Sequence, residues 1–525
     1  MNNGQTREVI DALRQGGIVA LNERDMFSLW VKTSCCNMDS RQLTRVADIA
    51  EKYGHGYVLF TTRQTPHIPF VNLKDVAEVK QELAKVELEL DRCGPRVRNL
   101  NVCYGADLCR YARMDCISLG EQLENFFRNE IVHKVKIGVA GCERDCIATR
   151  VLTDVGFVAR GTNGVPAYDA YVGGRLGVNA AVGQKVGEDL SEQQCVRLVQ
   201  NYVDLLSRGL KGERGADLIR RLGVSSVRQT LNAGIDRATE YRPVACPTKV
   251  RAASPAIETV RVRATCGEVT STQLRQIAEI SERYGKGFVH FGIRGAPEIP
   301  GVEPANIGSI RTELKSAGME MMEGGIDNIQ SCYAGYCSEG LADGQSLLKR
   351  LEPVVAELGI VDPAMTISAS GCPNSCGIAH LSEIGFHGVV EPEIDADACT
   401  GCELCLTVCK KKAITLQGNL GIIDKSECRY CGQCIAICPS EAIREKRKGF
   451  AVLVGGKAGE NTRLGETIAE FISEDEAFEL GRRCLVLARD NRSTVGDIVD
   501  RVGIAGFKKM LWGEDDRAGR PKAAH

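Results

Sequence analysis

An internal repeat constrains the fold of this chain more than any other feature of its sequence. Residues 51–69 and 282–300 share ten identities in nineteen positions at an offset of 231. Three cysteines of the first half are matched in the second half at offsets of 229 to 230: Cys103 by Cys332, Cys142 by Cys372, and Cys146 by Cys376. A repeat of this length indicates a duplicated pair of domains and not a solenoid of short units.

The second half also carries an insertion. YVGGRLG at 171–177 matches LVGGKAG at 453–459, so the offset has grown to 282 and about 52 residues have been added. Within the added segment, residues 399–409 and 428–438 each read C-x2-C-x2-C-x3-C. This is the signature of a two-cluster bacterial ferredoxin, in which the fourth cysteine of each run ligates the other cluster.

That rule predicts the ligands of each cluster. One [4Fe-4S] cluster should be held by Cys399, Cys402, Cys405 and Cys438, and the other by Cys428, Cys431, Cys434 and Cys409. The alternative is a pair of zinc ribbons. Zinc would take four ligands from two C-x2-C pairs and would leave half of these thiols without a metal, which disfavours this interpretation.

Each half contains a second type of cysteine set. The first half has C-x5-C followed by C-x3-C, formed by Cys103, Cys109, Cys142 and Cys146. The second half has C-x4-C, one residue shorter, followed by C-x3-C, formed by Cys332, Cys337, Cys372 and Cys376. Four thiolates can hold a cubane cluster. The alternative is buried free thiols that pack as small apolar residues, and the repeated spacing disfavours it.

The other cysteines and the seven histidines have no ligand spacing. We expect these cysteines to be buried free thiols: Cys35, Cys36, Cys93, Cys116, Cys195, Cys246, Cys266 and Cys484.

Composition and local pattern indicate a cytoplasmic α+β protein. The net charge of −2 gives no electrostatic reason to expect binding to nucleic acid or to an anionic membrane. No apolar run approaches the ~18 residues of a spanning helix, and the N-terminus lacks the features of a signal or transit peptide. Helical periodicity at VADIAEKYG and EVKQELAKVELEL alternates with the strand patterns GYVLFTTR and VHKVKIGVAG.

Several motifs resemble the sirohaem-dependent sulfite and nitrite reductase family. They are TTRQTP at 61–66, KVKIGVAGC at 134–142 and GCPNSC at 371–376. The arrangement is similar to the dissimilatory sulfite reductases, with the two halves fused in one chain and a ferredoxin module inserted. The resemblance implies an internally duplicated α+β fold with a pseudo-twofold axis.

The implied domains follow the repeat. Ferredoxin-like half domains are expected at 1–80 and 257–315, and sirohaem and cluster domains at 81–240 and at 316–391 plus 447–513. A linker at 241–256, the inserted ferredoxin domain at 392–446 and a flexible tail at 514–525 complete the expected chain.

The resemblance also implies site residues. Sulfite would be bound by Lys134, Lys136, Arg98 and Lys32. Arg63, Arg294 and Arg263 would bind carboxylates of the macrocycles. Cys376 would bridge its cluster to the sirohaem iron, and Cys146 would bridge the other cluster to a second, silent tetrapyrrole.

Two observations on the residues themselves bear on the lysines. Lys134 and Lys136 alternate on an expected strand, so both side chains leave the same face, and two neighbouring ammonium groups lower each other's pKa. The second half has Asp327, Ala364 and Thr366 in place of Arg98, Lys134 and Lys136. We therefore expect a single anion pocket, and the resemblance implies that first-half basic residues and second-half cysteines build it together.

The expected activity is six-electron reduction of sulfite to sulfide, with electrons entering through the ferredoxin domain and up to four [4Fe-4S] clusters. Reduction of nitrite to ammonia is the alternative within the class. An alternative of another class is a non-catalytic electron carrier or tetrapyrrole-binding protein. The expected partners are a small oxyanion substrate and an electron-donor protein or reductase, with no nucleic acid and no membrane insertion. The sequence leaves self-association into a homo-oligomer open.

Overall fold

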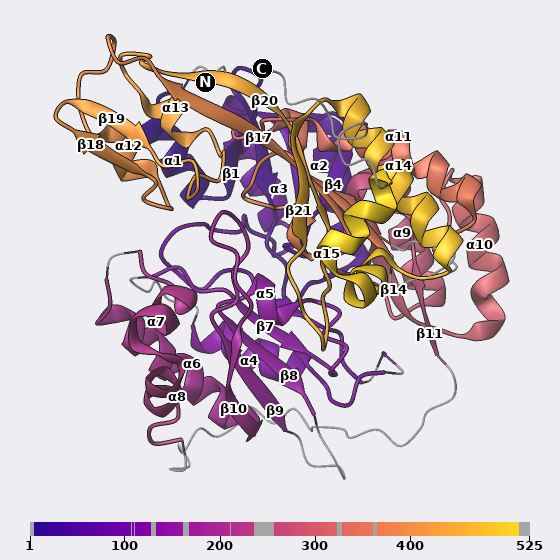
Figure 1. The fold of residues 1–525 in the computed structure, drawn as a ribbon. Coiled ribbons are helices and arrows are strands. Elements are labelled where there is room, and N and C mark those ends of the chain that lie inside the picture. The colour runs from indigo at the N-terminus through magenta and orange to yellow at the C-terminus, as the bar shows by residue number, and fades with distance from the viewer. Residues whose placement is uncertain are drawn as a thin grey trace.

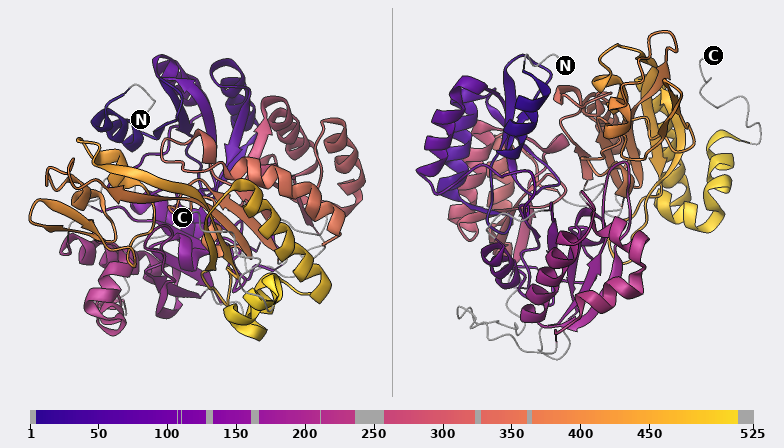
Figure 2. Two further views of the ribbon diagram at one scale, coloured as in Figure 1. Left: turned by 45° about the horizontal axis from the view of Figure 1, so that its top comes forward. Right: turned by 90° about the vertical axis from the view of Figure 1, so that its left-hand side faces the viewer.

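The computed structural model describes residues 5–106, 108–109, 111–127, 133–160, 167–210, 212–235, 257–322, 328–360 and 365–513. The expected linker at 241–256, the expected tail at 514–525, Cys246, Asp327 and Ala364 lie outside the described residues. The chain folds into an α+β structure with three lobes, which Figure 2 shows as the indigo and pink layers, the purple domain and the orange and yellow domain.

The two ferredoxin-like half domains exchange a strand. The first sheet has the order β1-β2-β5-β4-β12, formed by β1 (Ile18–Ala20), β2 (Met26–Trp30), β5 (Pro66–Asn72), β4 (Tyr57–Phe60) and β12 (Glu268–Thr270). The second has the order β11-β14-β13-β3, formed by β11 (Glu258–Arg261), β14 (Pro297–Val302), β13 (Phe288–Phe291) and β3 (Asn37–Asp39). Because β12 comes from the second half and β3 from the first, each half completes the other half's sheet.

Matching helices cover these sheets. Helices α2 (Ser40–Tyr53) and α9 (Ser271–Tyr284) have the same length and begin with capping boxes, at Asp39 and Thr270 respectively. They pack on each other in one apolar core that both halves share. The remaining helices of this lobe are α1 (Arg7–Gln15), α3 (Val76–Ala84) and α10 (Ile307–Ser316). The helices and strands therefore follow the duplication read from the sequence.

Each half also contains a mixed sheet that carries its cysteines. The first consists of β6 (Asn101–Val102), β7 (Ile137–Ala140), β8 (Val155–Ala159), β9 (Tyr168–Val172) and β10 (Gln184–Leu190). The second consists of β15 (Asn328–Ser331), β16 (Thr366–Ser370), β17 (Ile384–Ile394), β20 (Ile443–Val454) and β21 (Glu466–Ile472). In both sheets the first three strands are parallel, and a cysteine loop follows the middle one. Loops at the carboxyl ends of parallel strands are the usual place for ligands in such sheets.

Helices flank both mixed sheets. The first has α4 (Ile117–Phe126), α5 (Thr149–Leu152), α6 (Glu192–Ser207), α7 (Gly215–Leu222) and α8 (Val224–Leu231), and the second has α11 (Gly344–Leu358), α14 (Glu474–Asn491) and α15 (Val495–Trp512). None of the described helices combines the length and the apolar character that a bilayer span requires.

The insertion extends from the second mixed sheet. Strands β17 and β20 pair along their whole length and carry α12 (Leu404–Val408), β18 (Ile414–Gln417), β19 (Leu420–Ile423) and α13 (Gln433–Ile437) at their outer end. Figure 1 shows this module in orange at one end of the molecule. Its small core includes cysteines and isoleucines, as expected for a unit that is held together by clusters.

Candidate active site and iron–sulfur centres

The four cysteines of the second half converge on one place. Cys332 and Cys337 flank a short 3-10 helix at Ala334–Tyr336, and Cys372 and Cys376 lie in the loop after β16. Burial raises the pKa of Cys372 well above its usual range, and the charges of Cys376, Cys332 and Cys337 add to this effect. The backbone N–H groups of Gly371 and Ala334 point at the Cys332 sulfur from 3.2 and 3.4 Å. The set therefore has the ligand number, closeness and N–H donors of a cubane site.

The cysteines of the first half converge in the same way, with one addition. Burial raises the pKa of Cys142, and Cys146 and Cys109 act on it in the same direction. Cys103 contacts both Cys146 and a fifth thiol, Cys116, whose hydrogen bond is the largest influence that raises the pKa of Cys103. Cys116 is buried, as expected, but its place beside the set depends on the tertiary fold and has no signal in the spacing.

The cysteines differ in exposure. Of the eight in the two half sets, Cys146 and Cys376 are exposed, whereas the other six are buried or half-buried. Cys146 lines a cavity of about 1030 Å³. A thiolate that links a cluster to a macrocycle must present its sulfur on an open side. The exposed pair are the two cysteines to which the resemblance gives this role, so the residues present fit a tetrapyrrole beside each set.

No group of three or more His, Cys, Asp or Glu side chains in the described ranges is arranged to hold a single metal ion.

The second-half cysteine loops rest on the first half. The Thr62 hydroxyl donates a hydrogen bond of 2.9 Å to the carbonyl oxygen of Cys376. Asn22 hydrogen-bonds Tyr336 through its backbone N–H at 2.8 Å, and Leu21 forms a β-bridge with Cys337. The reverse contact also exists, because the Thr259 hydroxyl of the second half donates to Leu108 at 3.3 Å. Each cysteine set therefore lies against the sheet of the other half.

A cluster of positive charges lies in the first half. Lys134 and Lys136 lie on either side of the buried Val135, which forms an isolated β-bridge with Val97. Strand β7 begins only at Ile137, so both lysines precede it. Burial lowers the pKa of Lys134 to about 6, and the charges that add to this effect are Lys136, Arg98, Arg63 and Arg214. Burial lowers the pKa of Lys136 to about 7, helped by Arg63, Arg214 and Arg98 and opposed by Asp154. The structure thus brings together three of the four residues predicted to bind the anion.

Arg98 of this cluster has a hydrogen-bond donor that is unused in the described part of the chain. Arg98 is 4% exposed, donates to the Cys93 sulfur at 2.7 Å, and has no partner for its buried Nε among the described residues. Burial lowers the pKa of Arg98 to about 10, and Arg63 acts in the same direction. Arg63 pairs with Asp91 at 3.1 Å and lies 4.1 Å over the Trp30 ring. An unpaired buried donor in a positive site is what an anionic ligand would satisfy.

Arg214 and Asp154 are functional candidates that sequence reasoning missed. Asp154 accepts two hydrogen bonds of 2.8 Å from Arg214 and one of 2.9 Å from the backbone N–H of Lys136. This bidentate pair orients Lys136. It joins residues 60 positions apart, and no local pattern could have revealed it.

Lys32 and Arg263 lie in different surroundings. Lys32 has Glu89 at 3.5 Å and Glu124 at 3.7 Å, and it lines a cavity of about 970 Å³ together with Arg98. Lys32 is not among the charges named above that shift the pKa of Lys134 or Lys136. Arg263 pairs with Glu320 at 3.7 Å. The structure therefore pairs both predicted residues with carboxylates, and Lys32 shares its cavity with Arg98 of the positive cluster.

The reciprocal site has a different charge. Arg294, Thr366 and Glu383 line the cavity of about 1030 Å³ beside Cys146. Thr366 and Glu383 occupy the positions of Lys136 and Asp154, and burial raises the pKa of Glu383 to about 7. The described part of this site therefore has a threonine hydroxyl where the first half has the Lys136 ammonium group, and it keeps a carboxyl group at the position of Asp154.

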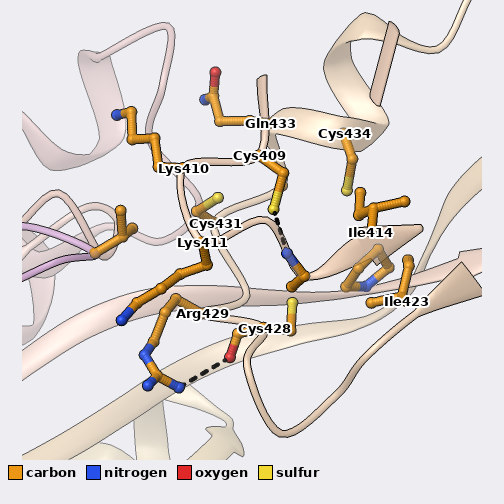
Figure 3. A pocket seen from close by; sticks show the side chains of 14 residues that line it. Cys409, Lys410, Lys411, Ile414, Ile423, Cys428, Arg429, Cys431, Gln433 and Cys434 are labelled. Atoms are coloured by element: carbon orange, nitrogen blue, oxygen red, sulfur yellow. Dashed lines mark hydrogen bonds between the residues drawn. The ribbon is translucent and has the colours of Figure 1, made fainter. Parts of the chain in front are cut away.

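In the ferredoxin module the four cysteines predicted to hold one of the two clusters lie together. Cys409, Cys428, Cys431 and Cys434 line one enclosed cavity of about 30 Å³ (Figure 3). Cys402 and Cys399 raise the pKa of Cys405 after the larger effect of its burial. Cys438 and Cys405 pack in one small apolar cluster together with Cys409 and Cys434, so this cluster does not separate the two predicted ligand sets.

The module touches the second-half cysteine loops at two points. Lys410 Nζ lies 3.4 Å from the side-chain oxygen of Asn374, which sits between Cys372 and Cys376. Gln433 hydrogen-bonds Glu339, whose backbone N–H donates to the Cys337 sulfur at 3.5 Å. Figure 3 shows Lys410 and Gln433 extending to the same side of the cavity.

Two domain-family models match this chain. The domain family described as "Nitrite and sulphite reductase 4Fe-4S domain" matches residues 93–237 and 324–520, and "Nitrite/Sulfite reductase ferredoxin-like half domain" matches residues 21–86 and 255–317. The chain belongs to the nitrite and sulfite reductase family. This is an oxidoreductase family with a 4Fe-4S domain, and its duplicated half domains account for the pseudo-twofold seen here.

Individual relatives share part of the chain. The coenzyme F420-dependent sulfite reductase of Methanocaldococcus jannaschii is 32% identical over 260 residues, which are 47% of this chain and 41% of that protein. An assimilatory-type sulfite reductase of Nitratidesulfovibrio vulgaris is 23% identical over 218 residues, 41% of this chain and 96% of that protein. The Mycobacterium tuberculosis NirA structure has the same fold, with a TM-score of 0.71, 17% identity, and coverage of 95% of this chain and 91% of that chain.

Proposed function

We propose that this chain reduces sulfite to sulfide at a site between its two halves, where first-half basic residues face second-half cysteines. The observation that carries the proposal is the hydrogen bond from Thr62 to the Cys376 carbonyl. It joins the segment that contains Arg63 to the loop whose exposed thiol would bridge to sirohaem. Arg63 is in turn one of the charges that act on Lys134 and Lys136.

The chain's own residues have defined tasks in this proposal. Lys136, oriented by Asp154 and Arg214, and Lys134 attract the oxyanion in their protonated forms and supply protons, because pKa values of about 7 and 6 allow exchange near neutrality. The free Nε of Arg98 gives a further donor. Sirohaem, held beside the exposed Cys376 thiol, would supply the redox-active iron for the reduction.

Electrons are proposed to enter through the inserted module. Four [4Fe-4S] clusters are assigned, two in the module and one in each half. The contacts of Lys410 with Asn374 and of Gln433 with Glu339 support a route from the Cys409 set to the second-half set. The reciprocal site, with Thr366 and Glu383, is assigned no turnover. An electron-donor protein or reductase is the proposed partner.

Nitrite reduction to ammonia remains the second candidate, because the same positive cluster suits either anion. Both activities are proposals, because the matched region covers only 41% of the length of the coenzyme F420-dependent sulfite reductase. An assimilatory ferredoxin-dependent nitrite reductase of Haloferax mediterranei is 22% identical over 406 residues, 67% of this chain and 69% of that protein.

The test is anaerobic turnover of the full chain with reduced viologen. Sulfide formed from sulfite and ammonia formed from nitrite are quantified, and the tetrapyrrole and iron contents are measured on the same sample. The proposal requires sulfite to have the larger kcat/KM. A larger kcat/KM for nitrite would make nitrite reduction the function and would refute sulfite reduction as the main activity. A fully loaded protein that turns over neither anion would instead support an electron carrier.

A further inference from the structure

A tyrosine of the second half is buried in the sheet of the first half. Tyr333 follows Cys332 directly, and it is 7% exposed. Its hydroxyl lies 2.7 Å from Ser28 Oγ, accepts a hydrogen bond of 3.1 Å from Trp30 Nε1, and contacts His67 Nδ1. Three first-half side chains therefore hold one hydroxyl group that is only a residue away from a candidate cluster ligand.

The direction of these hydrogen bonds follows from the chemistry of each group. The indole N–H can only donate, so the Tyr333 oxygen accepts from Trp30. His67 is 1% exposed, and burial, with a contribution from Arg63, holds its pKa well below the usual range. The neutral ring has one acceptor nitrogen and one N–H. We assign the acceptor to Nδ1, facing Tyr333, and the N–H to Nε2, which lies 3.1 Å from Thr65 Oγ1.

The hydrogen-bond network of Tyr333 contacts the second-half cysteine set at one end and the first-half positive cluster at the other. On one side, the backbone N–H of Ala334, next to Tyr333, points at the Cys332 sulfur from 3.4 Å. Hydrogen bonds to cluster sulfurs help to set the reduction potential. On the other side, the Trp30 ring supports the Arg63 guanidinium at 4.1 Å. Tyr333 is thus tied to the second-half cysteines and to the first-half positive cluster.

The other half contains a natural comparison. Tyr104 follows Cys103 as Tyr333 follows Cys332, but Arg261 and Glu298 stand at the positions of Trp30 and His67. The Tyr104 ring meets His290 edge-on at 4.8 Å, and its hydroxyl makes no hydrogen bond to any described residue. The network is therefore present on the side proposed to be catalytic and absent from the described part of the reciprocal side.

We propose that Tyr333 is a positioning residue that fixes the N–H···S geometry at Cys332 and the place of Arg63 over Trp30, and thereby tunes the potential of the second-half cluster. This inference rests on the proposed function, which assigns a cluster to that cysteine set. Losing the hydroxyl anchor should loosen the Ala334 N–H bond to sulfur. Because such bonds stabilise the more negative reduced cluster, the potential should fall.

The test compares Tyr333→Phe with Tyr104→Phe in the anaerobic, cofactor-loaded full chain. Electron paramagnetic resonance during a redox titration gives the potentials, and the second-half signal is assigned by its loss in Cys337→Ser. For Tyr333→Phe we expect full iron and sirohaem contents, a lower potential of that signal, and a kcat reduced about 3- to 10-fold with KM little changed. Tyr104→Phe should leave both quantities at the wild-type values.

An unchanged potential in loaded Tyr333→Phe, or an equal shift in Tyr104→Phe, would overturn the inference. If Tyr333→Phe loads poorly, Trp30→Phe removes one donor while keeping a ring beneath Arg63, and its potential must also fall. An unchanged potential there would be equally decisive. If Cys337→Ser keeps all signals and full turnover, the proposed function fails instead, so the two failures are distinguishable.

Discussion

Exchanging the lysine pair for its second-half counterparts gives the most direct test of where the anion binds. Lys134→Ala with Lys136→Thr copies into the first half the residues that the second half has at Ala364 and Thr366. The change removes two positive groups from a site that keeps its arginines. We expect cofactor loading to be retained and turnover to be largely lost.

The magnitude follows from the pKa values. With pKa values of about 6 and 7, about one tenth of Lys134 and about half of Lys136 are protonated at pH 7 in the free protein. Lys136→Thr should therefore cost more than Lys134→Ala at pH 7, and the two should become more alike near pH 6. Removal of one preorganised donor typically costs ~100- to 1000-fold in kcat. Because the lysines act together, the double variant should lose less than the product of the two single losses.

The assay is sulfite and nitrite turnover with reduced viologen between pH 6 and 9, with the sirohaem absorbance as a loading check. Anion affinity in the wild type should fall as the pH rises above about 7, because only the protonated lysines attract the anion. The reverse exchange, Ala364→Lys with Thr366→Lys, serves as the matched control. It should create no second active site, because Asp327 remains at the position of Arg98 and would repel the anion. Wild-type turnover in the loaded Lys134→Ala, Lys136→Thr variant would refute the assignment of the active site to this face.

Four further outcomes are expected. Lys410→Ala with Gln433→Ala should slow turnover with a protein donor by cutting the contacts between the module and the second-half loops, whereas Lys412→Ala on the same exposed loop should not. Anaerobic iron analysis should give about sixteen iron atoms per chain plus those of the macrocycles. A value near eight would mean that only the ferredoxin module holds clusters and that the two half sets hold none. Burial lowers the pKa of Lys136 from 10.5 to about 7, so between pH 7 and pH 10.5 the unfolded chain binds more protons than the folded chain. The unfolding free energy of the cofactor-free chain should therefore rise with pH over this range. Lys136→Met should make this rise smaller in denaturant titrations at several pH values. Cys116→Gly should leave the iron content unchanged, because four thiols remain at the first-half set, and a loss of about four iron atoms would make Cys116 a ligand.

The sequence predicts the repeated elements well because they depend on local pattern. The helices at Ser40–Tyr53 and Ser271–Tyr284 start at capping boxes and keep the same length, and the position of the ferredoxin insertion follows from the change in offset. The exchange of β3 and β12 has no such signal, because alternation along a strand specifies which residues face the core and does not specify the neighbouring strand.

The candidate site divides in the same way. The resemblance predicts four basic residues of the site, and the structure brings them together: Lys134, Lys136, Arg98 and Arg63. The bond between Arg214 and Asp154 and the contact between Cys116 and Cys103 depend on long-range packing, which leaves no trace in spacing. Lys32 is predicted from its place in the first strand, and its pairing with Glu89 and Glu124 becomes visible only in the folded chain.

The strand exchange between the half domains limits how this chain can change. Since β12 extends the first sheet and β3 extends the second, truncation at the junction would leave each fragment with an unpaired sheet edge and an incomplete core. The covalent link keeps the partner segments at a high effective concentration, so the interlocked pair can form without a second-order encounter. The half that lacks the lysine pair supplies both β12 and the Cys376 loop that the first half contacts, so the two halves depend on each other for the sheets and for the proposed site.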